Sequence, residues 1–290
     1  MKILNYGSMN VDNVYDVDHI VRPGETINAR GRHRNPGGKG LNQSIAVARA
    51  GGEVYHIGVL GADGDVLEQA LTRNHIHADY VKHVPGSSAH TMLQVDKNGQ
   101  NSIIVFADEA ITFTDTEMDE ILAHFVSGDA VIFQNELDRS PVFMQKAADR
   151  GLTVIFNPSP MEDSIFSYPL DRVSWFIVNE IEGGALTGET DPEKILDAMA
   201  KKYPAAGVVL TLGSDGAWCM RGPERIFQPA FSVKAVDTTA AGDTFLGYFT
   251  AGMLAGEPLD QVLRRAAKAS SIAVSRPGAA DSIPSRDELE

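Results

Sequence analysis

Residues 236–245 read Val-Asp-Thr-Thr-Ala-Ala-Gly-Asp-Thr-Phe, and the rest of the chain is organised around this stretch. A β-like run from Phe231 to Val236 precedes the small residues and a helical pattern of apolar residues follows them, which predicts a strand that turns into a helix. The first amides of a helix have no partner inside it and lie at the positive end of its dipole. Ala-Ala-Gly leaves these amides uncovered, so an anion could approach them closely. Asp243, taken alone, is typical of a helix cap.

The composition places further limits on function. The 290 residues are 43% hydrophobic, enough for one large α/β core. The net charge of −14, with no basic stretch, argues against a nucleic-acid partner. The single cysteine, Cys219, excludes an internal disulfide, and its apolar surroundings predict a core thiol. Because no apolar run approaches the ~20 residues of a membrane span and the N-terminus is unlike a signal peptide, we expect a cytoplasmic protein with no membrane partner.

Short apolar runs alternate with helical segments along most of the chain. Strands are expected at residues 3–6, 54–59, 130–133, 153–156, 175–178 and 207–212, and helices at 42–50, 66–73, 142–150, 180–186 and 193–203. This alternation indicates an α/β fold with a mainly parallel sheet covered on both faces. Ligands bind beyond the carboxyl ends of such strands, where Asn157, Asn179 and Asp237 fall. The polar residues 281–290 are expected to form a fraying end.

Two segments interrupt this alternation. Residues 11–35 have little helical period, and residues 88–106 read as a hairpin that turns at Lys97-Asn98-Gly99. We interpret both as a small β-layer, a lid over the strand ends, inserted in a single domain of residues 1–290.

Two polar motifs lie in or beside the expected lid. Residues 37–40, Gly-Gly-Lys-Gly, precede a helix and indicate an anion site, although Leu41 excludes a Walker loop. A flexible loop with a solvated Lys39 explains them about as well. Asn10 and Asp12 would point to one side of an extended segment and could bind hydroxyls, or could simply form a polar start to the lid.

Two more motifs follow expected strands of the main sheet. Asn179 and Glu182 suit a helix cap and a first-turn carboxylate. Residues 211–216, Thr-Leu-Gly-Ser-Asp-Gly, form a tight turn along which a nucleotide could lie. A surface hairpin explains that turn nearly as well.

Together these motifs resemble the PfkB-type, or ribokinase-like, carbohydrate kinases. The motifs occur in the family's order and the resemblance runs from Gly7 to about Pro284. It implies a three-layer α/β/α fold with a mainly parallel central sheet and a small β-sheet lid. It also implies an ATP-dependent kinase that phosphorylates a primary hydroxyl of a small sugar.

The resemblance implies a role for each matching position. Asp243 would be the general base for the attacking hydroxyl, and an anion hole would be formed by the amides of Ala240, Ala241, Gly242 and Asp243. The positions that would bind the sugar's hydroxyls are Asn10, Asp12, Gly38, Lys39, Asn42 and Glu136. Asn179 and Glu182 would order Mg²⁺ through its waters, and ATP would lie against Asn179, Thr211, Gly213, Ser214, Gly216 and Gly242. A potassium site would involve Asp237, Thr239, Ala273, Arg276, Gly278 and Ser282.

The acceptor is less narrowly defined than the reaction. Family members usually carry a Gly-Ala-Asn-type segment after the second lid strand, whereas residues 106–111 here read Phe-Ala-Asp-Glu-Ala-Ile. The sugar-binding positions are intact, so the resemblance favours D-ribose, converted to ribose 5-phosphate. Another sugar, a sugar acid or a nucleoside is the alternative, and a sensor of the same fold without catalysis is the third. The lid has open edges, and members of the family that the chain resembles often pair their lids. Together these imply a homodimer formed through the lid.

Overall fold

The computed structural model describes residues 1–107 and 112–289, and its centre is a nine-stranded sheet. Its strands are β1 (Lys2–Tyr6), β4 (Glu53–Leu60), β5 (His77–His83), β8 (Ala130–Phe133), β9 (Thr153–Phe156), β10 (Trp175–Asn179), β11 (Gly207–Thr211), β12 (Gly216–Arg221) and β13 (Glu224–Pro229). They lie in the order β13-β12-β11-β10-β9-β8-β1-β4-β5. All neighbours from β5 to β11 are parallel, and β12 and β13 add an antiparallel edge.

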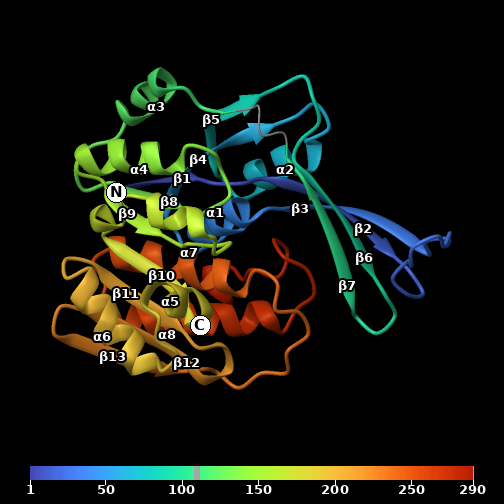
Figure 1. Cartoon of the computed structure of the whole chain (residues 1–290). Coiled ribbons are helices and arrows are strands. Elements are labelled where there is room, and N and C mark those ends of the chain that lie inside the picture. The colour runs from blue at the N-terminus through green and yellow to red at the C-terminus, as the bar shows by residue number, and fades with distance from the viewer. Residues whose placement is uncertain (108–111, 290) are drawn as a thin grey trace.

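Helices cover both faces of this sheet (Figure 1). One face carries α1 (Lys39–Arg49), α2 (Asp65–Arg73), α7 (Ala241–Leu254) and α8 (Leu259–Val274). The other carries α3 (Asp115–Leu122), α4 (Ser140–Asp149), α5 (Glu180–Thr187) and α6 (Pro192–Lys202). Alternate strand residues supply the two cores, so Ile3 packs on the first face and Leu4 on the second. The expected α/β fold with a mainly parallel sheet is confirmed.

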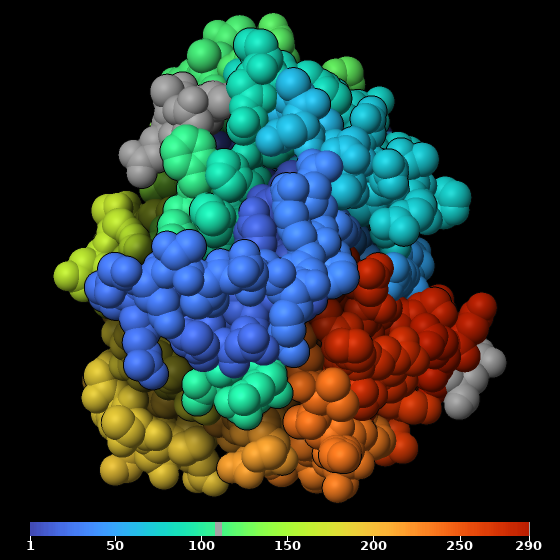
Figure 2. All heavy atoms as spheres, turned by 90° about the vertical axis from the view of Figure 1, so that its right-hand side faces the viewer, coloured from blue at the N-terminus to red at the C-terminus, as the bar shows by residue number. Residues whose placement is uncertain are grey.

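A second, four-stranded sheet projects from the side of this body (Figure 1), and Figure 2 shows the molecule from that side. It consists of β2 (Asn10–Asp16), β3 (Gly31–Gly37), β6 (His90–Val95) and β7 (Asn101–Phe106), in the order β3-β2-β6-β7. The expected hairpin is β6–β7, and β2 joins it to β3. The edge strand β7 exposes about half or more of four large apolar side chains, those of Ile103, Ile104, Val105 and Phe106.

The strand expected at Phe231–Val236 is wrong. β13 ends at Pro229, which has no amide hydrogen for a further ladder bond. β13 is also the edge of the sheet, so the next residues have no strand to pair with. Val236 instead donates its amide to the carbonyl of Val274, at the end of α8. Asp237 therefore follows a loop and not a strand.

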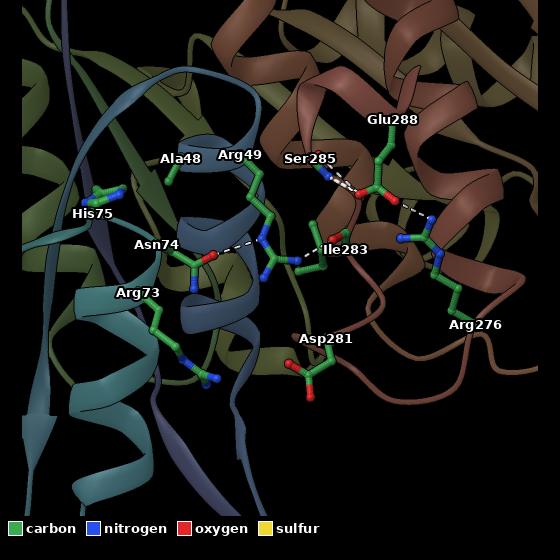
Figure 3. A pocket seen from close by; sticks show the side chains of 10 residues that line it. All are labelled: Ala48, Arg49, Arg73, Asn74, His75, Arg276, Asp281, Ile283, Ser285 and Glu288. Atoms are coloured by element: carbon green, nitrogen blue, oxygen red, sulfur yellow. Dashed lines mark hydrogen bonds and ion pairs between the residues drawn. The ribbon is translucent and has the colours of Figure 1, made fainter. Parts of the chain in front are cut away.

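The C-terminal residues do not fray as expected. Arg49 donates to the carbonyl oxygens of Ala280 and Ile283, and Tyr248 donates to that of Pro284. These bonds bury Ile283 against the first helical face. A cavity of about 480 Å³ remains between this segment and the ends of α1 and α2, with Arg49 at its centre (Figure 3). Its lining contains none of the proposed sugar or nucleotide positions.

Two smaller expectations concern single features. Cys219 is buried in β12 as a core thiol, and burial raises its pKa to about 12. Among the described residues, no helix has the length and apolar character needed to cross a membrane. Asp108 and Glu109, the two carboxylates that depart from the family pattern, lie outside the described residues.

Candidate functional site

The candidate site lies where the parallel strands end and two helices begin. A close approach of two glycines brings α1 to this edge, because a Cβ on Gly40 would lie 2.4 Å from the Cα of Gly7. Gly38, with φ of +96°, has no room for a Cβ beside Met9 and Asn10 either. The glycines of residues 37–40 are therefore required by packing, and they set the first turn of α1 against the end of β1.

Asp243 lies in the first turn of α7 and is 7% exposed. Its Oδ1 accepts a hydrogen bond from Nε2 of Gln43 at 3.0 Å, and its Oδ2 one from Nδ2 of Asn42 at 3.3 Å. Nζ of Lys39 lies 3.9 Å from Oδ1. All three partners come from the start of α1, so the first turns of two helices meet at this carboxylate. Asp243 makes no side-chain cap of its own helix, which removes the cap interpretation.

The residues before Asp243 present their amides in an unusual conformation. Ala240 precedes α7 with φ of +59°, a left-handed conformation that is rare for a residue other than glycine. Such strain clusters at functional sites. The amide of Ala241 donates to the carbonyl of Thr238, whereas within the described residues the amides of Gly242 and Asp243 have no protein acceptor. The space where a Cβ of Gly242 would lie is open, so an anion could reach these two amides.

Lys39 carries the positive charge of the site. Its pKa is raised, chiefly by the carboxylate of Asp243, against the opposing effect of burial. Glu136, which follows β8, accepts a hydrogen bond from the hydroxyl of Ser8. Removal of water by the surrounding protein raises the pKa of Glu136, and the bond from Ser8 and the charge of Lys39 oppose this. Lys39 thus interacts with carboxylates on two sides.

Asn10 and Asp12 lie on β2, in the small sheet. Oδ1 of Asp12 accepts the hydroxyl of Thr91 at 2.8 Å, and Gly37 leaves room for this carboxylate, since a Cβ there would lie 2.0 Å from Oδ2. Burial raises the pKa of Asp12 despite the bond from Thr91. No hydrogen bond in the described structure joins Asn10 or Asp12 to Asp243, so the small sheet and the helix starts hold two separate polar groups.

Asn179 and Glu182 form a capping box at the start of α5. Oδ1 of Asn179 accepts the amides of Ile181 and Glu182, and Oε2 of Glu182 accepts the amide of Asn179 at 3.0 Å. The cap interpretation is therefore correct, and it commits the side-chain oxygen of Asn179. Glu182 is buried, which raises its pKa, and Oε2 also accepts from Asn157 at 3.3 Å. Within the described residues, no three His, Cys, Asp or Glu side chains form a metal-binding group.

The expected nucleotide turn joins two antiparallel strands. Thr211 ends β11 beside Asn179 of β10, and the turn continues as a short 3₁₀-helix, Gly213–Asp215. Gly216 is required by packing, because a Cβ there would lie 2.2 Å from the carbonyl oxygen of Gln228. Gly213 and Ser214 are exposed at the sheet edge. The hairpin interpretation is thus correct for the backbone, and the exposed residues of the turn, Gly213 and Ser214 among them, are open to a ligand.

Two of the expected potassium positions, Thr239 and Gly278, contact Asp237. Its Oδ1 accepts the amide of Thr239 at 2.9 Å and its Oδ2 the amide of Gly278 at 3.0 Å. Burial raises the pKa of Asp237, but the bonds from Thr239 and Gly278 outweigh it and lower the pKa. Ala273 and Ser282 are buried in the same segment. The side chain of Arg276 points away, to Glu288 at 2.5 Å (Figure 3).

Sequence reasoning missed the contacts of Gln43, Ser8 and Asn157. Gln43 donates to Asp243, and Ser8 donates to Glu136. The available signal was the run Asn42-Gln43-Ser44, three polar residues in a helix whose neighbours are apolar. All three are buried. Polar residues on a helix face that packs on a sheet predict buried hydrogen bonds.

A buried carboxylate among amide and lysine donors at a helix start, on a three-layer α/β/α fold, suits transfer of a charged group to a hydroxyl. Residues 1–286 match the family described as pfkB family carbohydrate kinase, and the chain belongs to this family. The predictions of the family, of the fold class and of a carbohydrate kinase are therefore confirmed.

Individual relatives agree with this assignment. The ribokinase of Schizosaccharomyces pombe is 35% identical over 313 residues, which cover 100% of this chain and 97% of that protein. The structure of ribokinase from Cryptococcus neoformans var. grubii in complex with ADP has a TM-score of 0.85 at 32% identity and covers 99% of this chain and 98% of that one. The structure of Arabidopsis thaliana ribokinase complexed with ribose and ATP has a TM-score of 0.85 at 30% identity and covers 99% and 96%.

Proposed function

We propose that this protein is an ATP-dependent ribose kinase that forms ribose 5-phosphate. The observation that carries the proposal is the position of Asp243 at the start of α7. Its carboxylate lies 3.9 Å from Nζ of Lys39, which begins α1. Asp243 accepts the proton of the primary hydroxyl as that oxygen attacks the γ-phosphate. The amides of Gly242 and Asp243 donate hydrogen bonds that stabilise the negative charge developing on the transferred phosphoryl group.

The sugar and the nucleotide approach this carboxylate from opposite sides. Asn10, Asp12, Lys39, Asn42 and Glu136 bind the sugar's hydroxyls, because their carboxylates and amides offer both acceptors and donors. ATP lies along the exposed turn at Gly213 and Ser214. Residues 1–290 act as one kinase domain, and the small sheet is its lid. The relatives that bind ribose, ATP or ADP support this assignment of partners.

Two metal ions complete the proposed site. Glu182 is a buried carboxylate with one oxygen turned to Asn157 and Asn179, and its chemistry suits the water shell of Mg²⁺. When bound there, Mg²⁺ would neutralise charge on the ATP phosphates. A potassium ion fits the loop at Asp237, whose oxygen-rich segment, residues 273–282, lies against the start of the anion-hole loop. Both assignments rest on the donor sets of these residues.

Acceptor specificity provides the test of the proposal. The protein is assayed with ATP and a panel of D-ribose, 2-deoxyribose, fructose, gluconate and adenosine, and ADP formation is coupled to NADH oxidation. We expect the highest kcat/KM with D-ribose. A preference of more than tenfold for another acceptor would replace ribose while keeping the kinase assignment, and no turnover with any acceptor would favour the sensor.

We also propose a homodimer formed through the lid. The apolar residues Ile103 to Phe106 on the edge strand β7 support it, because such edges are usually covered. Light scattering should give twice the monomer mass for the wild-type protein. Ile104→Lys should shift the measured mass towards that of the monomer. A monomeric wild-type protein at micromolar concentration would contradict the proposal.

A further inference from the structure

A chain of buried polar side chains runs beneath the site. Its members come from α1 and from the strands under it, and each is at most 1% exposed: His56, Ser44, Asn5, Gln134 and Gln43. Buried polar groups cost free energy unless they are hydrogen-bonded. The last member of this chain, Gln43, donates to the carboxylate of Asp243, so the buried network is connected to the site.

The direction of the hydrogen bonds is fixed at one end by a backbone carbonyl. The oxygen of Gly7 can only accept, so Nε2 of His56 donates to it at 3.1 Å. Nδ1 of His56 then accepts the hydroxyl of Ser44 at 2.8 Å, and burial lowers the pKa of this histidine to about 4. Ser44 in turn accepts from Nδ2 of Asn5 at 2.8 Å. The orientation of the Asn5 amide is therefore determined.

Gln134 transmits this orientation to Gln43. Nε2 of Gln134 donates to Oδ1 of Asn5 at 2.9 Å and to Oε1 of Gln43 at 2.7 Å. These two bonds use both hydrogens of its amide nitrogen, whereas its own Oε1 has no hydrogen-bond partner among the described residues. A flipped Gln43 would turn its oxygen to the carboxylate of Asp243 and its nitrogen to that of Gln134. The network therefore holds the Gln43 amide with its hydrogens towards Asp243.

We propose that Gln43 is a positioning residue that holds Oδ1 of Asp243 in place for its reaction with the sugar hydroxyl. The proposal rests on the proposed kinase function. Without Gln43, the carboxylate would keep Asn42 at 3.3 Å and Lys39 at 3.9 Å. The attraction of Lys39 would then draw the carboxylate into a closer ion pair and away from the hydroxyl. Gln43 prevents this movement with a directed hydrogen bond of ordinary length, 3.0 Å.

The same amide also reaches the proposed magnesium side. Nε2 of Gln43 lies 3.5 Å from Oδ1 of Asn157, whose Nδ2 donates to Oε2 of Glu182 at 3.3 Å. Gln43 therefore lies between the two carboxylates that the reaction uses. Its loss displaces the base first, because the bond to Asp243 is the shorter of the two.

A double-mutant cycle tests this role. Gln43→Met keeps the length of the side chain and removes its amide. We expect kcat with ribose to fall about 10- to 100-fold, with KM for ribose and ATP within about threefold, because Gln43 positions the base and does not itself bind sugar or nucleotide. In an Asp243→Asn background we expect Gln43→Met to have almost no further effect, since the carboxylate that it positions is gone.

Ser44→Ala is the control. It removes an equally buried polar group from the same chain. Nδ2 of Asn5 still donates to the carbonyl of Gly40 at 2.8 Å, so the orientation of Asn5, Gln134 and Gln43 is retained and the loss of kcat should be clearly smaller. Gln43→Glu, which keeps an acceptor for Gln134 and sets a second carboxylate against Asp243, should lower kcat at least as much as Gln43→Met and provides the test if the Met variant does not fold. Circular dichroism melts establish folding at the assay temperature.

The possible results separate the two proposals. Equal factors for Gln43→Met in the wild-type and Asp243→Asn backgrounds, or equal losses for Gln43→Met and Ser44→Ala, would overturn the positioning role alone. A folded wild-type protein that phosphorylates no acceptor would overturn the kinase proposal and the positioning role together.

Discussion

Asp237 and Asp243 flank the same loop, yet the protein holds their carboxylates in different ways. Asp243 is 7% exposed, and side-chain amides of another helix, α1, hold it. Asp237 is half-buried, and the backbone amides of Thr239 and Gly278 hold its two oxygens. The first carboxylate is held by the first turn of α1, and the second ties the loop to the segment that follows α8.

The difference indicates what each carboxylate can do. A carboxylate has about four acceptor sites, and one amide on each oxygen leaves further lone pairs for a substrate or an ion. For Asp243 those lone pairs lie near Lys39. Asp237 has no lysine partner among residues 1–107 and 112–289. We therefore expect the same substitution to have different effects at the two positions.

The largest effect is expected for Asp243→Asn. The amide has nearly the same shape but cannot accept the proton, so kcat should fall by about 10³-fold, within the range for loss of a general base. KM for ribose and ATP should change only a few-fold, as steady-state kinetics would show. Turnover within tenfold of wild type would remove Asp243 as the base.

A smaller effect is expected for Asp237→Asn, the matched substitution. An amide nitrogen would face one of the two backbone amides, so one anchor of the loop is lost. We expect kcat to fall about tenfold and the stimulation by KCl over choline chloride at equal ionic strength to decrease. A loss as large as that of Asp243→Asn, with an unchanged response to potassium, would contradict the loop-anchor interpretation.

Gly278→Ala should have a still smaller effect. The Cβ would meet open space, and φ of +86° costs only about 1 kcal/mol for an L-residue. The amide that donates to Asp237 is retained. We expect kcat within about threefold of wild type and a slightly lower melting temperature by circular dichroism. If the loss of kcat matched that of Asp237→Asn, the conformation of the loop would matter more than the carboxylate.

Features with a local sequence signal could be predicted, whereas features that depend on long-range packing could not. The parallel strands and the β6–β7 hairpin follow from apolar runs and from Asn98-Gly99, which are local signals. The antiparallel edge at β13 and the loop at residues 231–236 depend on which strands are available for pairing, and local pattern does not contain that information. The motif order identifies Asp243, whereas the hydrogen bonds that hold its carboxylate do not follow from any motif. Gln134 bonds to Gln43 and Asn5 across 91 and 129 residues, so these contacts exist only once α1 has packed on β1 and β8.

The smallest expected effect is on the pH dependence of stability. It tests the loop-anchor role of Asp237 without any measurement of activity. The hydrogen bonds from Thr239 and Gly278 lower the pKa of folded Asp237 below the ordinary value of about 3.9. A lowered folded pKa contributes stability above the unfolded pKa, and this contribution is lost as pH falls through the folded pKa. The melting temperature of wild type should therefore exceed that of Asp237→Asn at pH 6, and the difference should shrink from about pH 5 downwards. Thermal melts of both proteins at pH 6, 4 and 3 measure this difference, because most of the loss falls below the unfolded pKa of about 3.9, and Gly278→Ala is the control that keeps the carboxylate. A difference that stays constant over this range would mean that the Asp237 carboxylate contributes no charge-dependent stability to the loop.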